Sequence, residues 1–255
     1  MLPILNRPVV DYVVADCVKA GVKEIIFVVL PGETQLRDYY SRNQKLEDYL
    51  LDRKAQDKYD LIADVHKQAE FRFIEQPQDS RYGTAIPPLL AKEFIEQDEA
   101  FLVLMGDDFI FNKDGSSEVA RLIKTYENSR AAAAMACAEV PQRELSKYGV
   151  VQFSKNGIHD MFEAIIEKPK ADSAPSNLIN ISKYVFTYGI FEYLKRVKPD
   201  SSSGEHYIID AVNEQVAHKK QTAIHKITGQ YLDAGTVEGW LMANQVLAKA
   251  QGLLK

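Results

Sequence analysis

The sequence predicts an α/β fold in which a doubly wound, mostly parallel mixed sheet carries helices on both faces. Strand-like apolar runs alternate with helix-periodic segments through residues 1–140, which is typical of strands joined by crossover helices. The second half brings several strand runs close together before it returns to helices, and this adds a mixed region to the sheet. A chain of 255 residues is long enough for one domain with a substantial core.

The elements of the first half follow from hydrophobic periodicity and from helix and strand breakers. Pro8 suits a first helical residue and Gly21 a helix stop, and the apolar residues between them have helical spacing. A buried strand over 23–30 ends at Pro31-Gly32, and residues 34–66 are charged with a helical period. The elements that follow are a strand at 70–75, a helix at 84–97, a strand at 100–105, a helix at 116–128 and a strand at 132–140.

The second half has a different pattern, with short strands separated by short breaks and then helices. Its predicted strands lie near 149–153, 159–167 and 178–187, and its predicted helices near 189–197, 206–219 and 236–251. No internal repeat or low-complexity tract divides the chain. We therefore expect a single domain over 1–255, with two halves that meet near residue 140.

Composition and charge limit the kinds of molecule that we expect this protein to bind. Apolar residues make up 46% and charged residues 26% of the chain, as in ordinary globular proteins. A net charge of −5 without a dense Lys/Arg block argues against nucleic acid, although a small phosphorylated ligand needs only a few local cations. No apolar stretch is long enough to span a membrane. Cys17 and Cys137 are isolated, so we expect reduced thiols and a cytoplasmic protein.

Two separate aspartates are candidate metal ligands. Asp107 follows the strand at 100–105, and ligands bind at the carboxyl ends of strands in open α/β sheets. A carboxylate there can hold Mg²⁺ against phosphate oxygens, although Asp and Gly are also common in plain turns. Asp233 precedes the last helix, where the simpler interpretation is a helix start with Thr236 as N-cap. If the two carboxylates converge, they form a candidate metal site.

Weaker signals lie at other strand ends. Glu167 and Lys168 end an apolar strand, where Glu can accept hydrogen bonds from sugar hydroxyls and Lys can pair with phosphate. A charged strand end before a Pro turn explains the same residues without a ligand. Gly149 precedes a strand and can allow close approach of a ligand or simply form a turn. Gln76 ends a short strand and Gly83 opens a helix, whose N-terminus can receive anions or base oxygens.

Other chemistries find no support in the motifs. The five histidines have no metal-ligand spacing, no Cys/His zinc pattern is present, and no G-x-S-x-G elbow occurs. These histidines are His66, His159, His206, His218 and His225.

The order of the motifs resembles the sugar-phosphate nucleotidyltransferases, in particular bacterial UTP–glucose-1-phosphate uridylyltransferases, from Met1 to about Lys249. The most specific run is S-K-Y-G-V-V, E-K-P-K and A-P-S-N-L. A helical stretch at 41–68 also resembles an insertion typical of uridylyltransferases, which favours UTP over dTTP. The matching segments are M-L-P-I (1–4), Y-V-V (12–14), A-G-V-K-E-I (20–25), G-D (106–107), S-K-Y-G-V-V (146–151), I-I-E-K-P-K (165–170), A-P-S-N-L (174–178), G-E (204–205) and Y-L-D-A-G (231–235).

The resemblance implies a Rossmann-like fold of the nucleotide-diphospho-sugar transferase type, with a nucleotide-binding half over 1–140 and a sugar-binding half over 141–255. It implies that a glucose-1-phosphate oxygen attacks the α-phosphorus of UTP and that pyrophosphate leaves without a covalent enzyme intermediate. The residue roles that it implies are uracil recognition by Gln76 and Gly83, Mg²⁺ binding by Asp107 and Asp233, glucose contacts from Gly149, Glu167 and Glu205, phosphate binding by Lys168 and a pocket wall at Asn177.

The sequence also departs from the family pattern. The family's first strand and its Gly-rich loop, similar to G-x-G-T-R followed by a P-K pair, are expected before M-L-P and are missing from this sequence. We expect exposed strand edges, association into homo-oligomers and little or no transferase activity, because one lost preorganised donor commonly costs roughly 10²–10³-fold in rate. Within the chain, Ser182 stands where the family often has Gly.

Three interpretations follow from these observations. The first is a uridylyltransferase whose sequence, as given, begins at an internal methionine of the full enzyme. The second is a non-catalytic paralogue that binds a sugar nucleotide. The third is a metal-dependent glycosyltransferase, which the E-K-P-K and Y-L-D-A-G segments fit less well.

Overall fold

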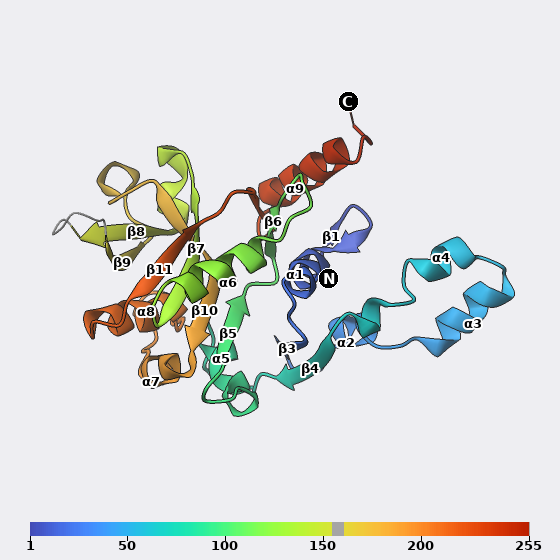
Figure 1. Cartoon of the computed structure of the whole chain (residues 1–255), viewed down its shortest axis with the longest axis horizontal. Helices are drawn as coiled ribbons and strands as arrows, with labels where there is room; N and C mark the ends of the chain where they lie inside the picture. The colour runs from blue at the N-terminus through green and yellow to red at the C-terminus, as the bar shows by residue number, and fades with distance from the viewer. Residues whose placement is uncertain (155–160, 255) are drawn as a thin grey trace.

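The computed structural model describes residues 1–154 and 161–254, and its amino-terminal half alternates strands with helices (Figure 1). The strands of this half are β1 (Pro3–Ile4), β2 (Arg7–Pro8), β3 (Glu24–Val29), β4 (Glu70–Glu75), β5 (Ala100–Leu104), β6 (Asp108–Phe111) and β7 (Ala133–Glu139). Its helices are α1 (Val9–Lys19), α2 (Gln35–Tyr39), α3 (Gln44–Asp52), α4 (Gln56–Asp60), α5 (Ile86–Ala91) and α6 (Glu118–Asn128), with 3-10 turns η1 (Val65–Lys67) and η2 (Lys92–Phe94).

Among the described residues, the second half contributes strands in close succession and three helices. The strands are β8 (Gly149–Ser154), β9 (Met161–Glu167), β10 (Leu178–Thr187), β11 (Thr222–Lys226) and β12 (Gln230–Asp233). The helices are α7 (Phe191–Leu194), α8 (Ile208–Ala217) and α9 (Val237–Ala250), with 3-10 turns η3 (Gln142–Lys147), η4 (Ala171–Ser173) and η5 (Tyr188–Ile190). The start of the strand predicted at 159–167, including His159, lies outside the described residues.

The largest sheet is mixed and joins strands from both sides of residue 140. Its order is β11-β7-β10-β8-β9, and β5 also pairs with β10. The β11–β7 pair is parallel, whereas β10 runs antiparallel to β5, β7 and β8. A mixed sheet with helices on its faces confirms the predicted α/β class, and its pairing around β10 is more antiparallel than the alternation in the first half suggests.

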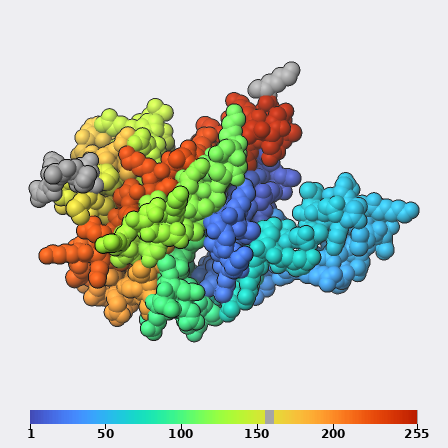
Figure 2. Space-filling model, viewed as in Figure 1, coloured from blue at the N-terminus to red at the C-terminus, as the bar shows by residue number. Residues whose placement is uncertain are grey.

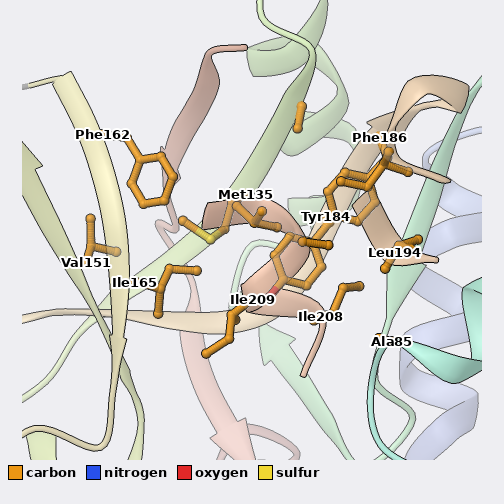
Figure 3. Packing of buried hydrophobic residues seen from close by; sticks show 14 of the residues in the cluster. Ala85, Met135, Val151, Phe162, Ile165, Tyr184, Phe186, Leu194, Ile208 and Ile209 are labelled. Carbon is orange, nitrogen blue, oxygen red and sulfur yellow. The ribbon is translucent and has the colours of Figure 1, made fainter. Parts of the chain in front are cut away.

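Helices cover both faces of this sheet because β7 is apolar on both sides. Its odd-numbered residues Ala133, Met135 and Cys137 pack in one cluster with α8, and its even-numbered alanines pack in a second cluster with Leu122 of α6. Successive side chains of a strand point to opposite faces, so an unbroken apolar run indicates a strand buried on both sides. Figure 3 shows the first cluster, where Met135 lies between Ile165 and Tyr184.

Within residues 1–154 and 161–254, three two-stranded sheets accompany the large one: the parallel pair β3–β4 and the antiparallel pairs β6–β12 and β1–β2. In the described part of the chain, β3 pairs only with β4 and β5 only with β10, so each keeps one unpaired edge. Apolar side chains on both strands, such as Phe27 and Phe101, are only partly buried. The expectation of exposed strand edges is therefore confirmed.

Helices α3 and α4 form an arm that projects from the rest of the molecule (Figure 2), whereas Tyr40 at the end of α2 is buried and stacks on Phe27 of β3. The predicted helical segment at 34–66 is thus broken into α2, α3, α4 and η1. The predicted helix at 84–97 is also shorter, since η2 ends at Phe94 and Ile95 is extended. Among the described residues, no helix combines the length and apolarity that a membrane crossing requires.

Candidate active site

Asp107 and Asp233 converge, although they lie far apart in the sequence. Asp107 is the residue before β6 and Asp233 ends β12, and the antiparallel pairing of these two strands brings them together. The Ala234 amide donates to the Asp107 carbonyl at 3.0 Å. A Cβ placed on Gly235 would lie 3.1 Å from Asp233 Oδ1 and 3.2 Å from Asp107 Oδ2. The two carboxylates therefore face one point in space.

This pair fits a divalent cation whose other ligands come from substrate and water. Hard cations such as Mg²⁺ take carboxylate oxygens and usually keep several waters and substrate phosphates in their coordination sphere. No group of three or more His, Cys, Asp or Glu side chains suited to a metal occurs within residues 1–154 and 161–254. Asp107 is exposed and Asp233 partly exposed, so both remain accessible to a phosphate-bound cation.

Asp108, the neighbour of Asp107, points the other way and is buried. Its carboxylate forms an ion pair with Lys183 of β10 and accepts a hydrogen bond from Tyr231 of β12 at 3.0 Å. Burial raises the pKa of Asp108, and the Lys183 ammonium opposes that rise. Sequence reasoning missed Lys183 and Tyr231. The available signal was a lysine inside the apolar strand 178–187.

Tyr148 connects the aspartate pair to the sugar-side residues. Its hydroxyl donates to Asp233 Oδ2 at 3.4 Å, and its carbonyl accepts from the Lys168 amide at 3.1 Å. Burial, together with the charge of Asp233, raises the pKa of Tyr148 to about 12, so its hydroxyl keeps the proton at neutral pH. Sequence reasoning did not single out this residue, which precedes Gly149.

Gly149, Glu167 and Lys168 form a second group on β8 and β9. Gly149 is the register partner of Glu167, and a Cβ on Gly149 would lie 3.0 Å from Glu167 Oε2 and 2.7 Å from Ile165 Cγ2. Lys168 Nζ lies 3.6 Å from Glu167 Oε1. Burial raises the pKa of Glu167, Lys168 lowers it, and the nearby Glu205 carboxylate raises it further. Glu205 therefore belongs to the same electrostatic neighbourhood.

Gly83 lies against the loop that carries Glu205. A Cβ on Gly83 would fall 2.5 Å from Glu205 Cγ and from the His206 amide nitrogen. The His206 amide donates to the Tyr82 carbonyl at 2.9 Å, and its carbonyl accepts from the Ala85 amide at 2.9 Å. These bonds clasp the two loops together, and we call residues 82–85 with 203–206 the loop clasp.

Gln76 and Asn177 form hydrogen bonds with residues outside these groups. Gln76 follows β4, and its side-chain amide donates to the Arg81 carbonyl at 3.0 Å, one residue before the loop clasp. Asn177 is exposed, and its carbonyl accepts from the Val140 amide at 3.1 Å. Within the described residues, no hydrogen bond or ion pair joins Asn177 to Glu167 or Glu205. The structure thus links the other sequence-predicted residues through neighbours but does not bring Asn177 to them.

A pocket of about 690 Å³ lies next to the aspartate pair. Asp233 and Tyr148 form part of its wall, and the carboxyl ends of β7 and β11 supply Glu139 and Lys226. Glu238 and Met242 of α9 line it on another side. The open space beside Asp233 is therefore bordered by charges of both signs.

Comparisons with known proteins identify the family of this chain. The family model described as "Nucleotidyl transferase" matches residues 1–250. The UTP–glucose-1-phosphate uridylyltransferase of Pseudomonas aeruginosa strain PAO1 is 31% identical over 248 residues, covering 95% of this chain and 85% of that protein. The enzyme of the same name from Mycoplasma pneumoniae is 31% identical over 247 residues, covering 96% of this chain and 82% of the other.

Solved structures give the same result. A crystal structure of apo UDP-glucose pyrophosphorylase aligns with a TM-score of 0.86 at 28% identity, covering 98% of this chain and 90% of that one. The UTP-bound enzyme from Acinetobacter baumannii aligns with a TM-score of 0.82 at 27% identity, covering 97% and 85%. The family model, the sequence relatives and the solved structures agree, and the chain belongs to the nucleotidyl transferase family, in the group of UTP–glucose-1-phosphate uridylyltransferases.

Proposed function

We propose that this protein transfers a uridylyl group from UTP to glucose-1-phosphate and forms UDP-glucose and pyrophosphate. The observation that carries the proposal is the convergence of the Asp107 and Asp233 carboxylates on one point beside Gly235. Tyr148 connects this pair to Glu167 and Lys168, the residues suited to a sugar phosphate. The names of the relatives support the choice of UTP and glucose-1-phosphate as substrates.

In this proposal Asp107 and Asp233 would hold Mg²⁺, which would neutralise charge on the phosphates. Lys168 pairs with the phosphate of the sugar, and the Glu167 carboxylate accepts hydrogen bonds from glucose hydroxyls. The sugar-phosphate oxygen attacks the α-phosphorus of UTP, the bond to the pyrophosphate oxygen breaks, and no covalent bond to the protein forms. Catalysis then consists of positioning and charge neutralisation.

The remaining residues contribute to recognition. Gln76 carries an amide that can both donate to and accept from the uracil edge, and Gly83 offers backbone at the opening of α5. Gly149 allows the Glu167 side chain to lie close against β8, where it can face the sugar, and Glu205 accepts from a further hydroxyl. From the family resemblance, we predict that Asn177 forms an outer wall of the sugar pocket.

The test is pyrophosphate release from UTP and glucose-1-phosphate with and without Mg²⁺. We expect Asp107→Asn to lower the rate by about 10²-fold or more, because one of two carboxylates for the cation is lost. Asp98→Asn is the matched control, since Asp98 is exposed and lies outside the site. Equal rates for the two variants would count against the proposal.

The same assay separates the alternatives. Binding of UDP-glucose without pyrophosphate release favours a non-catalytic sugar-nucleotide-binding protein. Transfer of glucose from UDP-glucose to an acceptor favours a metal-dependent glycosyltransferase.

Self-association and a cytoplasmic location stay predictions. Exposed apolar residues on α9, with Val237 69% exposed and Met242 53% exposed, support association. Light scattering coupled to gel filtration measures the mass of the species in solution.

A further inference from the structure

We infer that Lys183 and Tyr231 are positioning residues for the metal site, which act by holding Asp108 and so placing Asp107 and Asp233. The inference rests on the proposed function, because it concerns the geometry of the two carboxylates that would bind the cation. Lys183, Tyr231 and Asp108 do not themselves face the shared point beside Gly235. Their effect is exerted through the strands that carry Asp107 and Asp233.

The Asp108 carboxylate is held at both oxygens. Lys183 Nζ pairs with Oδ1 and also donates to the Asp108 carbonyl at 3.3 Å, while the Tyr231 hydroxyl donates to Oδ2 at 3.0 Å. Asp108 is 5% exposed and Lys183 3% exposed, so neither bond competes with bulk water. One carboxylate therefore ties together three strands, β6, β10 and β12.

Two residues of this network, Asp108 and Tyr231, lie one or two positions from a candidate metal ligand in the sequence. Asp108 is directly bonded to Asp107, and Tyr231 is two residues before Asp233 on β12. Side chains alternate along a strand, so an anchored Asp108 directs Asp107 to the opposite face, whereas Tyr231 lies on the same face of β12 as Asp233. Asp108 is also the register partner of Asp233 in the β6–β12 pair. Loosening Asp108 would change the spacing of both carboxylates at once.

The backbone of β10 is irregular where it delivers Lys183. Ser182 has a φ of +52°, in the left-handed region that disfavours side chains. The pairing of β10 with β7 shifts register between Asn180 and Tyr184, which is typical of a β-bulge. A β-bulge changes the direction in which a side chain points. Here the buried Lys183 ammonium reaches Asp108, which lies on another sheet.

Stability alone does not account for this arrangement. Desolvation of two buried charges offsets most of their attraction, so apolar residues of similar volume often serve stability equally well. An ion pair with defined hydrogen bonds also fixes the relative geometry of the residues that it joins. Partners that orient metal ligands without touching the metal commonly contribute 10–100-fold to metal affinity or activity.

The test measures cation binding directly. Mn²⁺ is titrated into the protein saturated with UDP-glucose, and free Mn²⁺ is followed by electron paramagnetic resonance. Tyr231→Phe removes one hydroxyl and keeps the ring. We expect its Mn²⁺ dissociation constant to rise about tenfold, with UDP-glucose affinity in EDTA unchanged.

Tyr184→Phe is the matched control. Tyr184 is buried on β10 next to Lys183, and its hydroxyl accepts from Asn180 Nδ2 at 2.6 Å, within the core cluster on the other face of the sheet. It also loses one buried hydrogen bond, and we expect less than a twofold change in Mn²⁺ affinity. Lys183→Met leaves a buried carboxylate without its cation and lowers stability, so Tyr231→Phe carries the test.

The outcomes distinguish this inference from the proposed function. Wild-type protein that binds UDP-glucose but no Mn²⁺ would refute the proposed metal site and the positioning role with it. Wild-type protein that binds Mn²⁺ with an affinity equal to that of Tyr231→Phe would refute the positioning role alone. Loss of UDP-glucose affinity in EDTA in Tyr231→Phe would show a general structural role and also overturn the inference.

Discussion

Asp107 Oδ2 and Asp233 Oδ1 face the same point above the α-carbon of Gly235. The Gly235 amide also donates to Asp233 Oδ1 at 2.8 Å, so the backbone of this turn orients one carboxylate while its missing side chain leaves room for both. The turn after β12 is therefore part of the candidate cation site.

Gly235→Ala should weaken cation binding without unfolding the protein. The new methyl group would lie 3.1–3.2 Å from an oxygen of each carboxylate and occupy the space between them. We expect Mn²⁺ affinity in the presence of UDP-glucose to fall about tenfold, as for a displaced metal ligand. Gly189→Ala is the control, since its Cβ would meet Thr187 Oγ1 at an ordinary 3.6 Å. Unchanged affinity in Gly235→Ala would show that the carboxylates do not act together.

Gly83→Ala should disrupt the loop clasp. Gly83 has a φ of +115°, and the new Cβ would fall 2.5–2.6 Å from atoms of Glu205 and His206. Gly32→Ala is a matched control, because Gly32 has a φ of +75° and nothing within 4 Å of its Cβ position. We expect Gly32→Ala to cost about 1–2 kcal/mol in urea unfolding, and Gly83→Ala to cost more and to weaken UDP-glucose binding. Equal losses in the two variants would argue against the clasp.

Glu118 should make stability depend on acid pH. It is buried at the start of α6 and accepts hydrogen bonds from His225 Nε2 at 2.9 Å and from the amides of Thr228 and Gly229 at 3.2 and 3.1 Å. Burial raises the pKa of Glu118, but these hydrogen bonds outweigh burial and lower the pKa from 4.5 to about 2. Because the folded-state pKa is depressed, this stabilisation is complete above about pH 4.5 and is lost as the pH falls toward 2.

The measurement is urea unfolding of wild type and Glu118→Gln between pH 2 and 7. We expect a stability difference of at most about 3 kcal/mol near neutral pH that shrinks steadily below pH 4.5. A difference that stays constant across this range would contradict the assigned role of the ionised carboxylate.

Both thiols should resist modification in the native protein. Cys17 and Cys137 are free and buried, which agrees with the expectation of reduced, unpaired cysteines. Burial raises the pKa of Cys17 to about 12, and it also raises the pKa of Cys137. We expect a colourimetric disulfide reagent to react with neither thiol until the protein is unfolded. Rapid labelling under native conditions would contradict this burial.

Long periodic segments were predictable because their hydrophobic pattern is local. The strand at 70–75 has the predicted bounds, and so does the one at 178–187. Thr236 is the N-cap of α9 as predicted, and its hydroxyl accepts from the Gly239 amide at 3.1 Å. In contrast, the two-residue β1 and β2 and the four-residue β6 and β12 were not predicted, since such short strands contain too few residues to show a period.

The sequence by itself determined the fold class, the order of the long elements and, through motif order, the family and most candidate residues. Only the tertiary structure decided which of those residues meet. The pairing of β6 with β12 sets Asp107 against Asp233, and a bulge in β10 sends Lys183 to Asp108. Such contacts depend on strand register and on side chains far apart in the chain, and local sequence patterns contain neither.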